Sequence, residues 1–375
     1  MLKSQGGAPG IPRRNNMDAL RLIFASTVVV WHLFPLSHLA ALEAPASATE
    51  WVNGTWAVRG FFVISGFLIF QSFESSRSGR SYFEKRARRI YPAYFAVVMI
   101  CAIAGAFFTK LSLSAYFGRD WLSYVVNNLA FLNYRHPALP GVFTGNPETA
   151  VNGALWTIKV EVMFYASVPV LVWLFRKTQR EIAIAVLYAL SVAFYMYFSW
   201  KAVQTGRDSY DVLAKQLPGQ LCFFLAGAVL YYNFGAFKKY QKYLVPVALV
   251  AYIAATILDF YPLLPISTGI LVIAIAFGPY FGNAGRYGDF SYGIYIWHYP
   301  WIQLLVSLGV FAMNPYAGVA VLIAALGTSA LLSWHFVEKP WLRKESHYRV
   351  VEGKGTAGYE AGVGALHEAK EQAPS

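Results

Sequence analysis

Two ionisable residues, Arg21 and His32, stand eleven positions apart in an otherwise apolar stretch near the start of the chain. At about 100° per residue, eleven residues complete roughly three helical turns, so a helix presents both side chains on one face. A rise of about 1.5 Å per residue puts His32 roughly 16 Å beyond Arg21 along the helix axis. If Arg21 lies at a membrane boundary, His32 lies near the centre, where an ionisable side chain usually has a function. Its imidazole is suited to act as a general base or as a nucleophile.

A second apolar segment carries a stripe of polar residues at helical spacing. Thr157, Glu161 and Tyr165 follow one another every four residues, so a helix aligns them on one face. A carboxylate buried in a membrane needs a partner. Two partners remain open for Glu161: a salt bridge to Arg59, or a position beside His32 that orients the imidazole as a general base.

A later apolar segment contains a second histidine that falls near the predicted depth of His32. Ser291, Tyr295 and His298 share one helix face through spacings of seven and three residues. Two histidines at matching depth predict a shared polar cavity within the membrane. The candidates for the wall of this cavity, or for contact with an acceptor, are His298, Tyr295, Ser291, Trp156, Thr157 and Arg59.

A basic cluster precedes the third apolar segment. Arg86 and Arg89 are three positions apart and share a helix face, with Arg88 between them. One interpretation is an anchor that holds the helix at the inner membrane surface and contacts anionic headgroups. The other is a clamp for phosphate groups, to which guanidinium groups bind in a bidentate way. The sequence leaves both interpretations open.

The composition places the chain among helical membrane proteins. Apolar residues make up 57% and charged residues 13%, against about half and a quarter in soluble domains. Apolar runs of about twenty residues recur along the chain, which predicts an all-α integral membrane protein. We expect about ten membrane spans, near residues 20–42, 54–73, 91–109, 153–175, 181–200, 216–234, 243–260, 263–281, 290–311 and 317–336.

The distribution of basic residues predicts the orientation of these spans. With the N-terminus in the cytoplasm, 23 Lys and Arg fall in inner segments and 6 in outer segments. This ratio agrees with the positive-inside rule and places both termini in the cytoplasm. The net charge of +12 therefore reflects the inner loops rather than a nucleic-acid partner. Residues 1–16 are predicted to be a cytoplasmic tail, 17–344 the membrane domain, and 345–375 a disordered cytoplasmic tail.

These residues, in this order, resemble the acyltransferase type 3 family of integral membrane O-acyltransferases. The resemblance covers about residues 16–344. The matching motifs are the pair Arg21 and His32, the run Phe61–Phe67, the pair Arg86 and Arg89 before Tyr91–Pro92, the Trp156–Glu161 segment, the Ser291–Pro300 segment, and the closing Val337–Pro340. Many relatives carry Asp where Arg59 stands, so an acceptor role is not carried over to that position.

The resemblance implies an enzyme that transfers an acyl group, usually acetyl, from cytoplasmic acyl-CoA to a carbohydrate hydroxyl. It implies that Arg21 and His32 are essential, and that Arg86 and Arg89, with Arg88, bind the acyl donor. Acetyl-CoA is then a co-substrate, and the acceptor is a cell-surface or exported glycan such as an exopolysaccharide, O-antigen or lipo-oligosaccharide. The expected location is a bacterial inner membrane, in contact with its lipids.

Within this implied reaction, two routes and one rival function remain open. His32 either deprotonates the acceptor hydroxyl, with Glu161 orienting the ring, or carries the acyl group itself. No serine triad or metal-ligand cluster is visible, so neither a metal nor a bound cofactor is expected. The rival is a polytopic glycan or lipid transporter, because charges at mid-membrane depth also mark transport pathways. A different membrane acyltransferase fold would leave the spacing of Arg21 and His32 unexplained.

Overall fold

The computed structural model describes residues 11, 12, 14–43, 53–282 and 284–343. The predicted C-terminal tail at 345–375, and most of the predicted tail at 1–16, lie outside these residues. Every regular element in the described ranges is a helix, which confirms the all-α prediction.

The principal helices follow the predicted apolar segments. They are α1 (Met17–Ser37), α3 (Gly54–Glu74), α4 (Gly79–Ala104), α6 (Arg119–Leu129), α7 (Leu155–Lys177), α8 (Arg180–Thr205), α10 (Leu217–Tyr232), α11 (Phe234–Ile257), α12 (Leu264–Ala276), α13 (Phe290–Ser307) and α15 (Pro315–Leu332). The shorter elements are η1 (Ala40–Leu42), η2 (Gly105–Phe107), α5 (Leu113–Tyr116), α9 (Asp208–Ala214), η3 (Tyr261–Leu263), η4 (Ala284–Tyr287), α14 (Val310–Met313), the π-helix η5 (Ser333–Glu338) and α16 (Lys339–Trp341).

Eight helical stretches in the described part of the chain are long and apolar enough to cross a membrane. They begin with α1, α3, α4, α7, α8, α9, α11 and α15. The two other predicted spans appear as α12, which has 13 residues, and α13, which has 18 residues and carries His298, Gln303 and several aromatic rings. The protein is thus an integral membrane protein. The total of ten spans and the cytoplasmic position of both termini remain predictions.

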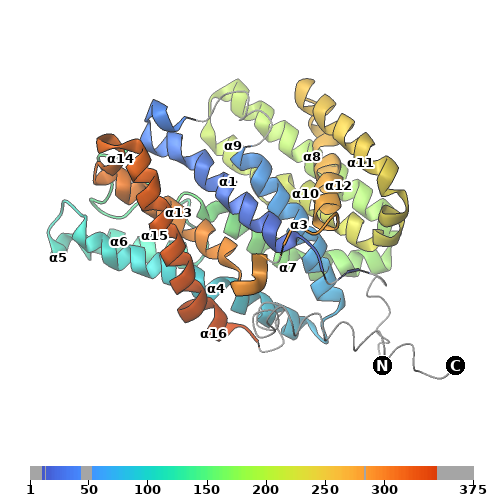
Figure 1. The fold of residues 1–375 in the computed structure, drawn as a ribbon, viewed down its shortest axis with the longest axis horizontal. Coiled ribbons are helices and arrows are strands. Elements are labelled where there is room, and N and C mark those ends of the chain that lie inside the picture. The colour runs from blue at the N-terminus through green and yellow to red at the C-terminus, as the bar shows by residue number, and fades with distance from the viewer. Residues whose placement is uncertain (1–10, 13, 44–52, 283, 344–375) are drawn as a thin grey trace.

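Helices α1 and α3 lie side by side in the middle of the bundle (Figure 1). In this view α4, α6, α13 and α15 lie on one side of them, and α8, α10, α11 and α12 on the other. Helix α1 packs against α13 as well as α3, and α3 also packs against α7, α10 and α12. Residues of α1, α3, α4, α7 and α13 therefore converge on one interior region.

Close contact between α3 and α10 depends on two glycines. A Cβ atom on Gly66 would lie 2.0 Å from the carbonyl oxygen of Phe224, and one on Gly227 would lie 2.1 Å from that of Val63. Gly60 similarly admits the ring of Phe24 from α1. Small residues allow membrane helices to approach each other this closely.

Helix α4 begins earlier than the sequence prediction for its span. The predicted span starts at residue 91, whereas the helix starts at Gly79, where the hydroxyl of Ser78 accepts from the amide of Ser81. Hydropathy marks the apolar part of a helix, but a capped helix continues through polar residues while its backbone hydrogen bonds are satisfied. As a result, Arg86 and Arg89 lie on the same continuous helix as the span.

The connection between α4 and α7 is attached to α13 by hydrogen bonds. It contains α6, which ends at Leu129; Phe131 has a left-handed backbone (φ 60°), which a continuing helix does not allow. The Nδ2 of Asn146 donates to the backbone and side-chain oxygens of Gln303 on α13, at 2.8 Å each. This connection therefore forms part of the folded domain.

Candidate active site

A cavity of about 830 Å³ opens among α1, α3, α4, α7 and α13. Its wall includes seven Lys or Arg and two carboxylates, so the cavity as a whole attracts anions. The basic residues are Arg21, Arg77, Lys85, Arg86, Arg88, Arg89 and Arg343, and the carboxylates are Glu161 and Asp289. Along α3 the lining extends from Ser75 to Val58, a rise of roughly 25 Å at about 1.5 Å per residue.

Arg86 lies at the basic end of this cavity. Its Nη2 donates to the hydroxyl of Ser72 at 3.2 Å, and its guanidinium carbon lies 5.8 Å from the ring centre of Tyr165. Its Nε is buried and has no hydrogen-bond partner among the described residues. Because a buried donor without a partner is unfavourable, Arg86 is well suited to receive an anionic ligand.

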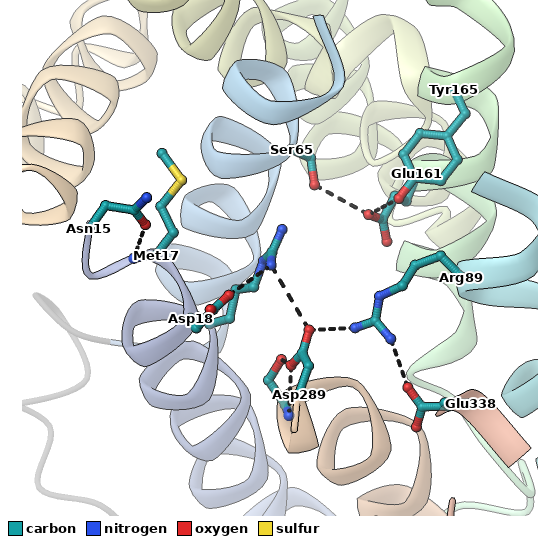
Figure 2. A network of polar contacts seen from close by, with 11 residues as sticks. Asn15, Met17, Asp18, Ser65, Arg89, Glu161, Tyr165, Asp289 and Glu338 are labelled. Carbon is teal, nitrogen blue, oxygen red and sulfur yellow. Dashed lines mark hydrogen bonds and ion pairs between the residues drawn. The ribbon is translucent and has the colours of Figure 1, made fainter. Parts of the chain in front are cut away.

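Arg89, the other arginine of the predicted clamp, is held by two buried carboxylates (Figure 2). Its Nη2 lies 2.5 Å from Asp289 Oδ2, and its Nη1 lies 2.8 Å from Glu338 Oε2. Glu338 also accepts from the hydroxyl of Ser333 at 2.9 Å. Arg89 thus joins α4 to α13 and to the π-helix η5, a role that neither sequence interpretation included.

Asp289 is a site residue that sequence reasoning missed. It precedes α13, and its carboxylate accepts from the backbone amide of Ser291 as an N-cap and also from the Ser291 hydroxyl. Its Oδ2 lies 3.9 Å from Arg21 Nη1, so Asp289 contacts both Arg21 and Arg89. An Asp just before a predicted helix indicates an N-cap, but it does not indicate that two arginines from distant helices contact the same carboxylate. Arg21 also pairs with Asp18 at 3.3 Å.

The side chain of Arg88, the third predicted donor-binding residue, is more exposed than that of Arg89. Its Nη2 lies 2.9 Å from Glu84 Oε1, and its Nη1 donates to the carbonyl of Trp341 at 3.4 Å. Glu84 also pairs with Arg343, whose Nη1 donates to Ser81 Oγ at 3.3 Å. Arg88 and Arg343 therefore share one carboxylate at the cavity mouth and keep a net positive charge there.

The opposite end of the cavity is polar but uncharged, apart from Glu161. Thr157 Oγ1 and the Tyr295 hydroxyl are 2.7 Å apart, and both residues line the wall. Glu161 Oε1 accepts from the Tyr165 hydroxyl at 2.5 Å and from Ser65 Oγ at 3.3 Å (Figure 2). Ser291 lines the cavity as well. The stripe predicted on α7 thus faces the cavity.

The contact partners predicted for Glu161 are wrong. Neither Arg59 nor His32 hydrogen-bonds to Glu161 in the described structure; its partners are Ser65 and Tyr165. The sequence fixes the helix face that carries Glu161, but the rotation and packing of α7 against α3 decide which side chains that face meets. Any effect of Glu161 on His32 must therefore be indirect.

His32 instead contacts His298, as the matching depth of the two residues predicted. His32 Nδ1 lies 3.0 Å from His298 Nε2, and the two rings stack with their centroids 5.1 Å apart. His298 is fully buried, whereas His32 is half-buried. His298 adjoins Tyr295, whose ring lies at the polar end of the cavity. Neither histidine lines the wall of the described cavity, so the prediction of a polar cavity shared by the two residues, with His298 in its wall, is wrong.

Arg59 and Trp156 lie away from the cavity wall, in contrast to their predicted role as cavity candidates. Arg59 Nη2 donates to the Tyr195 hydroxyl at 3.1 Å, and its guanidinium lies over the rings of Tyr195, Phe223 and Tyr261. Trp156 packs against the apolar core. The contacts of both side chains depend on how the helices pack, which their spacing in the sequence does not determine.

Two kinds of comparison relate this chain to known proteins. A family model described as an acyltransferase domain matches residues 14–334. The chain is 26% identical to nodulation protein 10 of Rhizobium leguminosarum bv. viciae, over 88% of this chain and 94% of that protein. It is 27% identical to an O-acetyl transferase of Shigella phage Sf6, over 89% of this chain and 98% of that protein. No solved structure matches the chain.

The family model covers most of the chain and includes α1, α3, α4, α7 and α13, the helices among which the cavity opens. The match also contains both histidines and both arginines of the motif on α4. The chain therefore belongs to the acyltransferase type 3 family and is an acyltransferase of the membrane.

Proposed function

We propose that this enzyme transfers an acyl group, most simply acetyl, from acyl-CoA to a hydroxyl of a glycan at the surface of a bacterial cell. The observation that carries the proposal is the cavity, which extends from a mouth rich in arginine to a polar end beside the paired histidines. The name of the phage relative supports acetyl as the group transferred.

The basic end suits the phosphates of coenzyme A. Arg86 has a buried guanidinium nitrogen without a hydrogen-bond partner in the described part of the chain, and Arg77, Arg88 and Arg343 lie around the same mouth. Arginine binds phosphate oxygens through charge-assisted hydrogen bonds. The long pantetheine arm would then follow the cavity along α3, which brings the thioester toward Thr157 and Tyr295. In this arrangement Arg89 supports the wall, because its two carboxylate partners already hold it.

His32 supplies the chemistry in either of two balanced routes. As a general base, it takes the proton of the acceptor hydroxyl while the oxygen attacks the thioester carbonyl; the C–S bond breaks, and the thiolate of CoA recovers the proton. As a nucleophile, it forms an acyl-imidazole with release of CoA, and the hydroxyl then attacks that intermediate. Both routes convert a thioester and an alcohol into an ester and a thiol.

The thioester must pass one more layer of side chains to reach His32. Phe61 and Tyr295 both line the cavity, and their rings meet edge to face with centroids 5.8 Å apart. Tyr295 in turn touches the ring of His298. We therefore infer that rotation of Phe61 or Tyr295 connects the cavity to His32 when the acyl donor binds.

Labelled acetyl-CoA supplied to membrane vesicles tests the proposal. Vesicles that contain the wild-type protein and a glycan acceptor should accumulate label in the glycan, whereas His32→Ala vesicles should not. The His136→Ala variant is the matched control, because His136 is an exposed loop residue and should transfer label as the wild type does.

Two outcomes would overturn the proposal. Equal labelling by wild-type and His32→Ala protein would remove His32 from the chemistry. Failure of wild-type vesicles to label any of several surface glycans from acetyl-CoA, with the protein correctly inserted, would exclude this donor and this acceptor class. Movement of unmodified glycan across the membrane in that case would favour a transporter.

A further inference from the structure

The contact between the two histidines is flanked by backbone carbonyls on both sides. His298 Nδ1 lies 2.5 Å from the carbonyl oxygen of Tyr295, within the same helix. His32 Nδ1 lies 3.0 Å from the carbonyl oxygen of Val28, one turn earlier on α1, and 3.0 Å from His298 Nε2. These three contacts form one continuous series from α13 to α1.

This series of three contacts determines which nitrogen of each histidine ring carries hydrogen. A carbonyl oxygen accepts hydrogen bonds and never donates, so His298 Nδ1 must carry the hydrogen that it donates to Tyr295. In the neutral ring, His298 Nε2 is then an acceptor. His32 Nδ1 must likewise carry hydrogen, because both of its partners, Val28 oxygen and His298 Nε2, are acceptors. The lone pair of His32 is therefore left on Nε2.

We propose that His298 is a positioning residue that holds His32 in the Nδ1–H tautomer, so that Nε2 carries the lone pair used in acyl transfer. This inference rests on the proposed function of His32 and names the residue that prepares it. When Nε2 takes up a proton or an acyl group, His32 Nδ1–H becomes a stronger donor, and His298 Nε2 accepts from it.

At the position of His298, a neutral partner for His32 is more suitable than a carboxylate. His298 is fully buried, and its ring lies against those of Tyr295 and Tyr299. A carboxylate desolvated there would be costly unless it remained paired. His298 is itself held in place through Tyr295. The Tyr295 hydroxyl lies 2.7 Å from Thr157 Oγ1, which fixes Tyr295, and the carbonyl of Tyr295 accepts from His298 Nδ1.

Two amide variants separate this role from simple packing. The side chain of His298→Gln places an oxygen near the position of Nε2 and can still accept from His32. The side chain of His298→Asn places its amide near the position of Nδ1; it keeps the donor to the Tyr295 carbonyl but leaves His32 without an acceptor. We expect His298→Gln to retain kcat within about tenfold of wild type and His298→Asn to lose about 100-fold, with an unchanged KM for acetyl-CoA.

The tautomer itself provides a readout that does not depend on activity. Full-length protein with ¹⁵N-labelled histidine, reconstituted in bilayers, should give a His32 signal with hydrogen on Nδ1, assigned by its loss in His32→Ala. In His298→Asn, part of this signal should move to the Nε2–H form, while His298→Gln should keep the wild-type signal. Gel filtration and thermal unfolding in detergent establish that each variant is folded.

Two results would overturn the positioning role. One is a His32 signal that stays entirely in the Nδ1–H form in a folded, inactive His298→Asn protein. The other is equal loss of kcat in both amide variants. If His32→Ala transfers label normally, the proposed function fails instead, and the tautomer measurement still reports the contact between the two rings.

Discussion

Arg89 Nη1 lies 2.8 Å from Glu338 Oε2, so the second arginine of the motif on α4 forms an ion pair inside the protein. The side chains of Arg89 and Glu338 are 17% and 2% exposed. Glu338 belongs to the π-helix η5, and a π-helix inserted near the end of α15 commonly marks a functional site. The two arginines of one short motif therefore have different partners, and this difference can be measured.

The Glu338→Ala variant should destabilise the protein without weakening donor binding. Removal of the carboxylate takes a buried acceptor from Arg89 Nη1 and from the Ser333 hydroxyl, which costs about 1–3 kcal/mol, while Asp289 still pairs with Arg89. The measurement is the thermal unfolding midpoint in detergent, together with the KM for acetyl-CoA of the folded fraction. Asp211→Asn is the control, because it breaks an exposed pair with Lys215 and should cost less than about 1 kcal/mol. A large rise in KM with unchanged stability would instead assign the Arg89 pair to the donor site.

The Arg86→Gln variant should show the opposite pattern. Loss of a charge-assisted hydrogen bond to a phosphate is worth about 1.5–3 kcal/mol, so the KM for acetyl-CoA should rise roughly 10- to 100-fold. Stability should change little, because Arg86 has no carboxylate partner among the described residues. Arg180→Gln, which alters an exposed arginine paired with Glu181, should leave the KM unchanged. Equal KM values for all three proteins would return Arg86 to the role of a membrane anchor.

The Glu161→Gln variant should retain much of the activity. Glu161 contacts Ser65 and Tyr165, both of which donate to it, and a glutamine oxygen can accept the same hydrogen bonds. Because it does not touch His32, we expect kcat to stay within about tenfold of wild type. A loss as complete as that of His32→Ala would show that the charge of Glu161 takes part in the reaction.

The two glycines between α3 and α10 should not tolerate a methyl group. In Gly66→Ala the new Cβ would lie 2.0 Å from the Phe224 carbonyl oxygen, and overpacking of this kind costs about 1–3 kcal/mol. The unfolding midpoint should therefore fall. Gly235→Ala is the control, because the new Cβ meets no atom within 4 Å from the other described residues, apart from its chain neighbours and its own helix backbone, and alanine favours the helix. A midpoint for Gly66→Ala at or above that of Gly235→Ala would contradict the described packing of α3 on α10.

Release of CoA in the absence of acceptor should separate the two routes at His32. If the imidazole carries the acyl group, purified protein mixed with acetyl-CoA alone should release about one CoA per protein in a rapid phase. If His32 acts as a base, release should require the acceptor hydroxyl from the start. A thiol-reactive dye in stopped flow measures the phase, and the His32→Ala protein supplies the background.

Much of the architecture follows from the sequence because it depends on local periodicity. Apolar runs of about twenty residues predicted the helices, and helical spacing predicted a shared face for Ser291 and Tyr295, which both line the cavity, whereas His298 does not. The start of α4 was misplaced, because the apolar run marks the part of a helix that lipid can cover and not the whole helix. The contact between His32 and His298 agrees with the matching depth predicted for them, but neither residue lines the cavity that they were predicted to share.

The pairing of side chains from different helices was decided by the tertiary structure. His32 lies on a definite face of α1 whatever the fold, but its neighbour is His298 and not Glu161 because α1 packs against α13 while the stripe on α7 faces the cavity. Arg89 likewise meets Asp289 and Glu338, which follow it by 200 and 249 positions. Helical periodicity fixes a side chain's direction relative to its own axis, whereas its partner depends on how each helix is rotated and packed, and close contacts such as that at Gly66 determine this packing.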